Sequence, residues 1–472
     1  MKKLLVLSAI LISSLFASTQ DDIARLEKEI AKLKKKIGKV NAQSANDFIK
    51  WSVDFRTAVD NVNYDMLNGT TRSKNDVFSM RLWLNMAFSP DSHNVFKGQL
   101  SMNKAFGADF SDMEGHRALA MGSLFDWTAN EALSDNTLKV RQAYWLYLGD
   151  NAFGFDDIPW TFSIGRRPST NGFLVNLRED DPEQSPLGHI INVEFDGISS
   201  KLDLSSVTGI DGMSFKICMG QGATNAEPLF VSSTPYTNVD SRLDDITLAG
   251  FIFEPYNDGQ YVAKITWFRA YDLPDVTFDA QGNVNGYESF GDLDGGALSL
   301  MVDGLTEEGY FSDAIVFASL AWTVTHPDTG KAMLGSTESE TGTSYWFGAQ
   351  LPVTEEGRFG VEFNHGSQYW RPFTYAEDTM IGSKLAVRGD AWEAYFTWHI
   401  NEALSAQLRY TKIDYEYTGS QGFFGNTTGT SIKIDELKRK VAENTATPLE
   451  QAMYDSTVES AQDIRFYIRY RF

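Results

Sequence analysis

The chain ends in IRFYIRYRF, residues 464–472, and the alternation within this stretch decides the fold. One face carries Ile464, Phe466, Ile468, Tyr470 and Phe472, and the other carries Arg465, Tyr467, Arg469 and Arg471. A repeat of two residues is typical of a β-strand whose two faces meet different surroundings. The stretch therefore fits a barrel strand between lipid and a wet lumen, and also a half-buried strand of a soluble protein.

The same alternation recurs along the chain from residue 49 onward. It begins at 49–55 and continues at 78–88, 95–105, 138–148, 160–166, 190–204, 213–221, 246–254, 260–272, 296–304, 313–325, 344–351, 358–366, 390–400, 404–416 and 460–472. Most of these segments approach the roughly 9–11 residues that cross a bilayer at a tilt. We predict a 16-stranded antiparallel transmembrane β-barrel over residues 49–472, preceded by a short N-terminal coiled-coil helix.

The connections between these strands alternate between long and short. The long ones include 61–77, 167–189, 273–295 and 417–459, whereas 89–94 is short. Outer-membrane barrels have long external loops and short periplasmic turns, and an even number of strands puts both termini on the periplasmic side. Charged side chains on the lipid face would cost roughly 2–4 kcal/mol at the midplane. The polar face of each strand is therefore expected to line an aqueous lumen.

The N-terminus carries two further segments. Residues 1–17 have two lysines, an apolar run and a small residue at the end, which predicts a cleaved secretory signal peptide. Residues 21–42 follow a heptad pattern, with a periplasmic coiled-coil core formed by Ile23, Leu26, Ile30, Leu33, Ile37 and Val40. This helix would help to oligomerise the barrel or touch the cell wall, or would simply pack on its own protein.

Composition excludes several classes of protein. A net charge of −22 makes nucleic acid an improbable partner. Beyond the N-terminus no apolar run is long enough for a transmembrane helix. One cysteine, Cys218, permits no intrachain disulfide. The six histidines are scattered and no nucleophile or phosphate-binding motif is present, so we expect no enzyme activity, no metal and no cofactor.

Three features resemble outer-membrane porins: the predicted signal peptide, the strand pattern and the terminal Phe472, which is expected to serve as the assembly signal. More narrowly, the stretch 360–373 (GVEFNHGSQYWRPF), continuing to Lys384, residues 388–390 and Glu393, is similar to a family of uncharacterised porin-like proteins of Gram-negative bacteria. The segment Gly165–Ser169 with Gly172 is similar to it too. The resemblance implies an outer-membrane barrel, usually trimeric, and no particular substrate.

In large porins the third external loop folds inward and narrows the pore. The corresponding connection here, 167–189, carries the candidate constriction residues Arg167, Arg178, Glu179, Asp180, Asp181 and Glu183. Candidate pore-wall residues are Arg56, Arg81, Lys97, Glu194, Glu362, Glu393, Arg409, Arg465 and Arg469. Opposed acids and bases would screen solutes by charge. The alternative is that this connection is a solvated external loop like the others.

The sequence thus favours a porin, a passive diffusion channel for small hydrophilic solutes or ions in the cell outer membrane. The alternative is a non-conducting structural or adhesive barrel anchored through its periplasmic coiled coil. A transporter for apolar ligands would need an apolar plug in the lumen, and the sequence shows none. Expected partners are outer-membrane lipid, the barrel-assembly machinery and further copies of the chain.

Overall fold

The structure is a computed structural model that describes residues 49–107, 133, 136–154, 158–167, 169–228, 237–239, 243–279 and 284–472. The predicted signal peptide and coiled-coil helix lie outside these residues. The chain divides into two compact units, Met1–Lys50 with Phe88–Pro90 and Trp51–Ala87 with Asp91–Phe472, and the fold below is that of the second. In the described part of the chain, no helix is both long and apolar enough to span a membrane.

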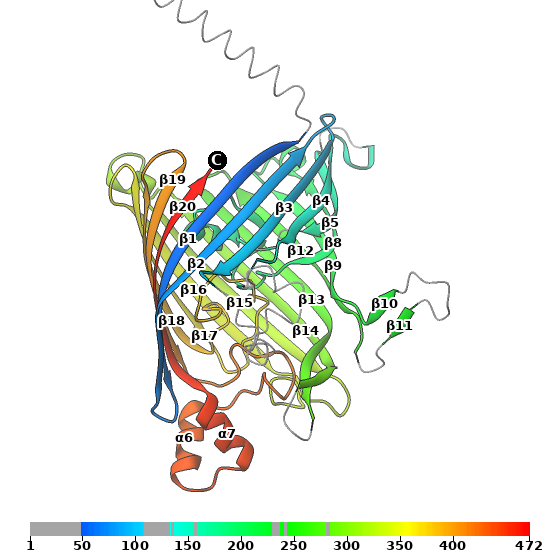
Figure 1. Ribbon diagram of the computed structural model, residues 1–472. Coiled ribbons are helices and arrows are strands. Elements are labelled where there is room, and N and C mark those ends of the chain that lie inside the picture. The colour runs from blue at the N-terminus through cyan, green and yellow to red at the C-terminus, as the bar shows by residue number, and fades with distance from the viewer. Residues whose placement is uncertain are drawn as a thin grey trace, which may run out of the picture. The chain divides into compact units, whose positions relative to one another are not determined.

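Sixteen of the described strands form a closed barrel, so the predicted antiparallel fold is confirmed (Figure 1). In barrel order they are β1 (Lys50–Met66), β2 (Thr71–Phe88), β3 (Asn94–Ala105), β4 (Lys139–Gly149), β5 (Trp160–Arg167), β8 (Phe195–Asp203), β9 (Ser214–Ala223), β12 (Ile246–Asn257), β13 (Tyr261–Phe278), β14 (Val284–Asp303), β15 (Ile315–Pro327), β16 (Thr341–Pro352), β17 (Gly357–Gly366), β18 (Gly389–His399), β19 (Leu404–Tyr415) and β20 (Val458–Arg471).

The barrel closes where its last strand pairs with its first. Strand β20 runs antiparallel to β1, from Asp54 opposite Arg471 to Met66 opposite Val458. The terminal residue extends this ladder, because Phe472 and Val53 exchange two backbone hydrogen bonds of 2.8 and 2.9 Å. Closure pairs the edges that an open sheet would leave free for other chains.

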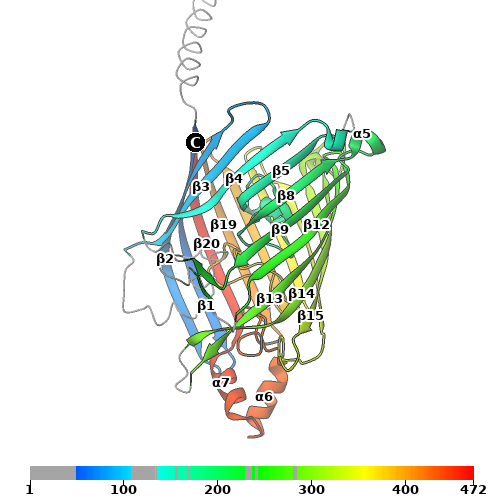
Figure 2. The same cartoon turned by 90° about the vertical axis from the view of Figure 1, so that its right-hand side faces the viewer.

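The two ends of the barrel differ. The C-terminus lies at the end that carries most short turns and α5 (Ser205–Thr208), whereas α6 (Ile434–Ala442) and α7 (Pro448–Ser456) lie at the opposite end (Figures 1 and 2). Two expected long loops are instead mostly strand: β1 and β2 leave only 67–70 between them, and β13 and β14 leave only 279–283. These hairpins lengthen the strands at the long-loop end.

The alternation of side chains places apolar residues outside and polar residues inside. On β20, Ile464, Phe466 and Ile468 are between 43% and 48% exposed, whereas Arg465 and Arg469 are 2% exposed. Strand β18 repeats the pattern, since its tryptophans Trp392 and Trp398 are exposed while Glu393 is buried. The period of two predicted this division for both strands.

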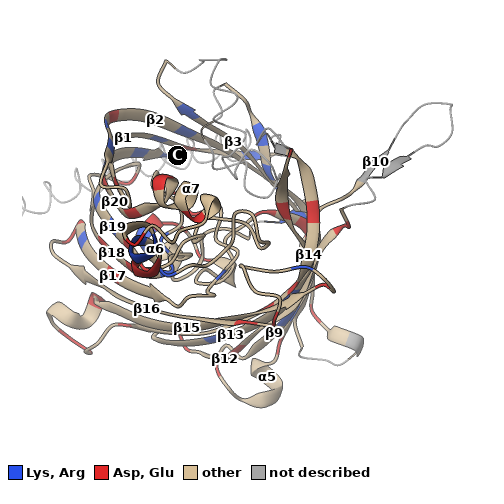
Figure 3. Cartoon of the chain, turned by 90° about the horizontal axis from the view of Figure 1, so that it is seen from below, with Lys and Arg blue, Asp and Glu red and all other residues tan. Residues whose placement is uncertain are grey.

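The remaining elements are short and belong to the connections. They are the 3-10 helices η3 (Ala152–Gly154) and η4 (Tyr310–Asp313), the helix α4 (Val175–Glu179), and the strands β6 (Gly172–Phe173), β7 (Gln184–Leu187), β10 (Ala226–Pro228) and β11 (Thr237–Val239). β6 pairs in parallel with β7. In the view along the barrel from the long-loop end, connecting segments lie inside the ring of strands, next to β16–β20 (Figure 3).

An apolar core lies inside the barrel, contrary to the expectation that the lumen holds no apolar plug. Its buried members come from β8, from β12–β15 and from four connections, and include Leu187, Ile190, Phe268, Leu293, Met333, Trp370, Phe373, Phe423 and Phe424. Each connection contributes only a few of these residues, and the sequence does not reveal that they meet. The lumen is therefore partly filled rather than uniformly aqueous.

Candidate functional site: the loop-lined lumen

The connection between β5 and β8 runs through the inside of the barrel, and α4 is its most enclosed part. The helix begins after Leu174, at φ 77°, and ends at Asp180, whose left-handed conformation lets its N–H reach the carbonyls of Asn176 and Leu177. The backbone turns at Leu174 and at Asp180 change the direction of the chain within a few residues. They aim Arg178 and Glu179 at the wall formed by β17–β20.

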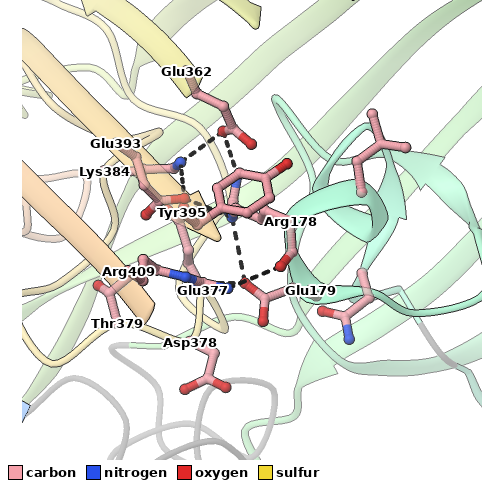
Figure 4. A network of polar contacts seen from close by, with 12 residues as sticks. Arg178, Glu179, Glu362, Glu377, Asp378, Thr379, Lys384, Glu393, Tyr395 and Arg409 are labelled. Carbon is pink, nitrogen blue, oxygen red and sulfur yellow. Dashed lines mark hydrogen bonds and ion pairs between the residues drawn. The ribbon is translucent and has the colours of Figure 1, made fainter. Parts of the chain in front are cut away.

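Arg178 is the centre of a buried network of charges (Figure 4). Its guanidinium is fully buried, and it lies 3.3 Å from Glu362, 3.8 Å from Glu393 and in direct contact with Glu377. Lys384 adds a second cation, with Nζ 2.7 Å from both Glu362 and Glu393. Buried charges are tolerated when paired and hydrogen-bonded. Every charge of this network has an oppositely charged partner, and among the described residues only Arg178 Nε and Glu362 Oε1 of these groups make no hydrogen bond.

The acidic residues that follow Arg178 contact the wall one after another. Glu179 accepts a hydrogen bond of 2.8 Å from Arg409. Asp180 lies 3.0 Å from His399 and 3.4 Å from Arg471, Asp181 pairs with Arg469, and Glu183 pairs with Lys264. The structure therefore brings five of the six candidate constriction residues, Arg178, Glu179, Asp180, Asp181 and Glu183, into contact with the inner wall. The sixth, Arg167, belongs to the wall itself, at the end of β5.

A second connection, 367–388, also lies inside the barrel, and the sequence analysis missed it as part of the site. Its Asp378 contacts Arg56, Arg81 at 3.1 Å and Arg465 at 3.1 Å. Burial by itself would raise the pKa of Asp378, but Arg56, Arg465 and Arg81 together hold that pKa well below its usual range. The available signal was composition, because Trp370 and Phe373 are unusual in a solvated loop.

The candidate wall residues fall into three groups. Inward and buried on their strands are Arg56, Arg81, Glu362, Glu393, Arg409, Arg465 and Arg469. Lys97 on β3 is exposed. Glu194 was placed in a strand starting at residue 190, which is wrong, because β8 starts at Phe195 and Ile190 to Glu194 still belong to the inward connection. Glu194 contacts Arg141 at 2.9 Å and Arg166 at 3.2 Å.

Trp83 is a further wall residue that charge-based reasoning overlooked. It occupies an inward position of β2 and is only 4% exposed. The guanidinium of Arg81 lies 3.5 Å from its ring centroid and that of Arg141 lies 4.3 Å away. Cation–π contacts of this kind stabilise closely spaced arginines. The alternation shows that Trp83 shares the face of Arg81, and this was the signal available in the sequence.

Cavities remain between the inward loops and the wall, including three with volumes of about 150 Å³ or more. The first, of about 290 Å³, lies against β4, β5, β8, β9, β12 and β13 and reaches Glu183, Gln184 and Ser185. The second, of about 240 Å³, lies against β1–β4 and also reaches Gln184. The third, of about 150 Å³, is lined by Arg56, Arg81, Asp378 and Arg465 among others. We name them the β9, β3 and β20 cavities.

The lining of these cavities is more basic than the chain as a whole. Eight basic side chains take part: Arg56, Arg81, Arg141, Arg167, Lys201, Lys216, Lys264 and Arg465. Six acidic side chains oppose them: Asp54, Asp181, Glu183, Glu254, Glu377 and Asp378. The excess of eight over six contrasts with the net charge of −22 for the whole chain.

Solved porins are similar to this chain at low sequence identity. Salmonella typhi OmpF in complex with daunomycin has TM-score 0.45 and 13% identity, over 90% of this chain and 99% of that one. An anion-selective porin from Comamonas acidovorans has TM-score 0.48 and 12% identity, over 90% and 99%. Pseudomonas putida OprB has TM-score 0.47 and 12% identity, over 92% and 97%.

No curated protein matches the chain. One family model does match, over residues 71–472, which is nearly the whole barrel. That model carries the description "Protein of unknown function (DUF3373)". The resemblance to an uncharacterised porin-like family, noted from the sequence, agrees with this match. The chain belongs to the family described as Protein of unknown function (DUF3373).

Proposed function

We propose that this protein is an outer-membrane porin, a passive channel through which small hydrophilic solutes or ions diffuse. The observation that carries the proposal is the succession of polar cavities along the inner wall. The β9 and β3 cavities share Gln184, and the β3 and β20 cavities meet the wall strands β1, β2 and β3 in common. Charged and polar side chains line all three, as passage of hydrated solutes requires.

The outer face supports a membrane location. Large apolar side chains are exposed around the barrel, including Ile217, Leu320, Phe347, Trp392, Leu408 and Ile468. So much exposed apolar surface is unfavourable in water. A closed barrel hydrogen-bonds every strand to its neighbours, which is the condition for spanning a bilayer with strands. The cell outer membrane is the compartment where barrels of this kind occur.

Orientation and assembly form part of the same proposal. The N- and C-termini would face the periplasm, and the loops at the α6 and α7 end would face outward. Export would use the signal peptide 1–17, and Phe472 would engage the barrel-assembly machinery. Residues 21–42 would form a periplasmic coiled coil that joins copies of the chain, with a trimer as the expected state.

The proposed constriction is the ring of contacts between the inward loops and the wall. Asp181 and Glu183 on one loop and Asp378 on the other would stand opposite the wall cations Arg56, Arg81 and Arg469. Acids on one side and bases on the other create a field across the passage. Such a field screens solutes by charge as well as by size.

Planar-bilayer electrophysiology tests the proposal. The purified full chain should produce stepwise conductance increments, and its reversal potential in a salt gradient should differ from zero. The matched control is the same protein after heat denaturation, which should leave the bilayer sealed. Folded, heat-modifiable protein that inserts but conducts nothing would overturn the porin proposal.

One observation favours the alternative, a non-conducting structural or adhesive barrel. The side of the lumen next to β16–β20 is packed with side chains, among them Arg178, Trp370 and Arg388, which are fully buried. If the packing extended across the lumen, ions could not pass. The conductance measurement separates the two functions, and uptake of small sugars into protein-containing vesicles provides a second readout.

A further inference from the structure

The β9 cavity combines unusual space with an excess of positive charge. Its volume of about 290 Å³ is far above the roughly 10–15 Å³ that a single water needs by a comparable measure. Four basic side chains line it, Arg167, Lys201, Lys216 and Lys264, against two acids, Glu183 and Glu254. The balance of charge in this cavity is therefore positive.

The two acids are already engaged by other cations. Lys264 contacts Glu183 and lies 3.3 Å from Glu254. Glu254 also lies 3.8 Å from Lys201 and accepts hydrogen bonds from Ser214, at 3.2 Å, and Asn257, at 2.7 Å. Neither carboxylate is bonded to the remaining two cations of the cavity.

Those two cations, Arg167 and Lys216, make only neutral contacts among the described residues of the lining. The guanidinium of Arg167 lies over the ring of Tyr144, at 5.1 Å from its centroid. Lys216 donates a hydrogen bond to the hydroxyl of Ser185 on β7. Arg167, Lys201 and Lys264 line the same cavity as Lys216, so that their like charges repel one another across it. An anion placed between Arg167 and Lys216 would relieve this repulsion.

Hydroxyl groups complete the arrangement. Ser163 and Ser199 line the same cavity from β5 and β8, and their oxygens lie 3.1 Å apart. In that pair one hydroxyl donates to the other, which leaves the accepting hydroxyl free to donate elsewhere. Ser185 accepts from Lys216 and so also keeps its own hydrogen available. Charged donors and hydroxyl donors together match the oxygens of a carboxylate or phosphate.

We propose that the β9 cavity is an anion-binding subsite in which Arg167 and Lys216 hold a carboxylate or phosphate group of a small solute. The inference rests on the proposed channel function, which it deepens by naming the preferred class of solute. It also reverses the selectivity that the net charge of −22 would suggest, because the solute meets the lining rather than the outer loops.

Two measurements on the full chain test the subsite. Isothermal titration of the detergent-solubilised protein uses inorganic phosphate in one arm and acetate in the other, and the arm that binds identifies the source of the anion. Bilayer reversal potentials in a potassium chloride gradient give the anion preference. The test variant is the double substitution Arg167→Gln with Lys216→Gln.

The matched control is Lys438→Gln with Arg439→Gln on α6, which removes the same two charge types from exposed ion pairs. We expect the lumen variant to weaken anion binding about tenfold or more, which corresponds to roughly 1.4 kcal/mol, and to shift selectivity toward cations. The α6 variant should do neither. Lys216→Arg, which keeps the charge, should retain binding and guards against misfolding as the cause.

The outcomes separate the two proposals. Stepwise conductance with no anion preference, or equal binding by the two double variants, overturns the subsite and leaves the channel standing. Binding of phosphate or acetate that only the lumen variant loses supports the subsite even in a barrel that does not conduct.

Discussion

Two sides of the same barrel use the same kind of wall in opposite ways. Beside β16–β20, the inward loops supply charged partners for the buried wall residues Glu362, Glu393, Arg409, Arg465 and Arg469. Arg178, Glu362 and Glu393 are buried in one network. Beside β4–β9, the loop pairs Glu194 with Arg141 and Arg166. Within its described residues it gives no carboxylate partner to Arg167 and Lys216, which line a cavity of about 290 Å³. The alternation of side chains along the strands thus determines which residues face the lumen. The inward loops determine whether those residues are packed into a core or line an open cavity.

Removing a charge from the centre of the packed side beside β16–β20 should cause the largest loss of stability. Arg178→Met would leave Glu179, Glu362, Glu377 and Glu393 with Lys384 and Arg409 as their remaining cations. Removing one partner of a buried ion pair costs about 3–5 kcal/mol. We expect a lower urea midpoint in lipid vesicles and a larger single-channel conductance as the loop detaches.

The control for that substitution is Arg439→Met on α6, where the ion pair with Glu443 is solvent-exposed. Exposed pairs contribute about 0–1 kcal/mol, so the midpoint should barely move. Equal destabilisation by the two variants would show that the Arg178 network does not hold the packed side together.

Asp378→Asn tests the border between the two sides. The substitution removes the carboxylate shared by Arg56, Arg81 and Arg465, although Arg465 keeps Asp60 at 2.6 Å. We expect a loss of about 1–3 kcal/mol, the usual cost of leaving buried donors unsatisfied. The added positive charge should also shift the reversal potential toward anions. An unchanged reversal potential would mean that the β20 cavity lies off the ion path.

Lowering the pH should destabilise the packed side through protonation of His189. Its two ring nitrogens form hydrogen bonds with the hydroxyls of Ser319, at 2.8 Å, and Ser344, at 2.9 Å. Burial lowers the pKa of His189 from 6.5 to about 3. Between these two values the unfolded state binds a proton that the folded state does not. Stability should therefore fall as the pH decreases, by up to roughly 1.4 kcal/mol per pH unit.

Urea midpoints measured between pH 7 and pH 4 check this expectation, with His189→Asn as the comparison. The variant lacks the titrating group, so its midpoint should depend less on pH than that of the wild type. Parallel curves for the two proteins would remove His189 as the source of acid sensitivity.

The smallest effect on stability is expected on the open side. Glu183 is 36% exposed at its side chain, so Glu183→Gln should change the unfolding free energy by less than about 1 kcal/mol. It would nevertheless leave Lys264 with Glu254 as its carboxylate partner in the lining and make the β9 cavity more positive. We expect a shift in selectivity toward anions with an unchanged urea midpoint, the reverse of the pattern for Arg178→Met.

Much of the site could be anticipated one residue at a time. Inward positions such as Glu362, Glu393 and Arg465 follow from alternation, because a strand turns successive side chains to opposite faces. The capping box of α7, formed by Thr447 and Glu450, is a local feature of the same kind. Which charges meet did not follow, since Arg178 and Glu362 are 184 positions apart.

The sequence by itself determined the sixteen strands, the two faces of the wall and the closing contact near residues 464–472. These features depend on the alternation of apolar and polar side chains along each strand. The alternation is required because one face of the strand meets lipid and the other meets water. Only the tertiary structure decided that 367–388 joins 167–189 inside the barrel, that Trp370 and Phe424 build an internal core, and where the cavities remain. Those features depend on which distant loops meet, and no local pattern encodes that meeting.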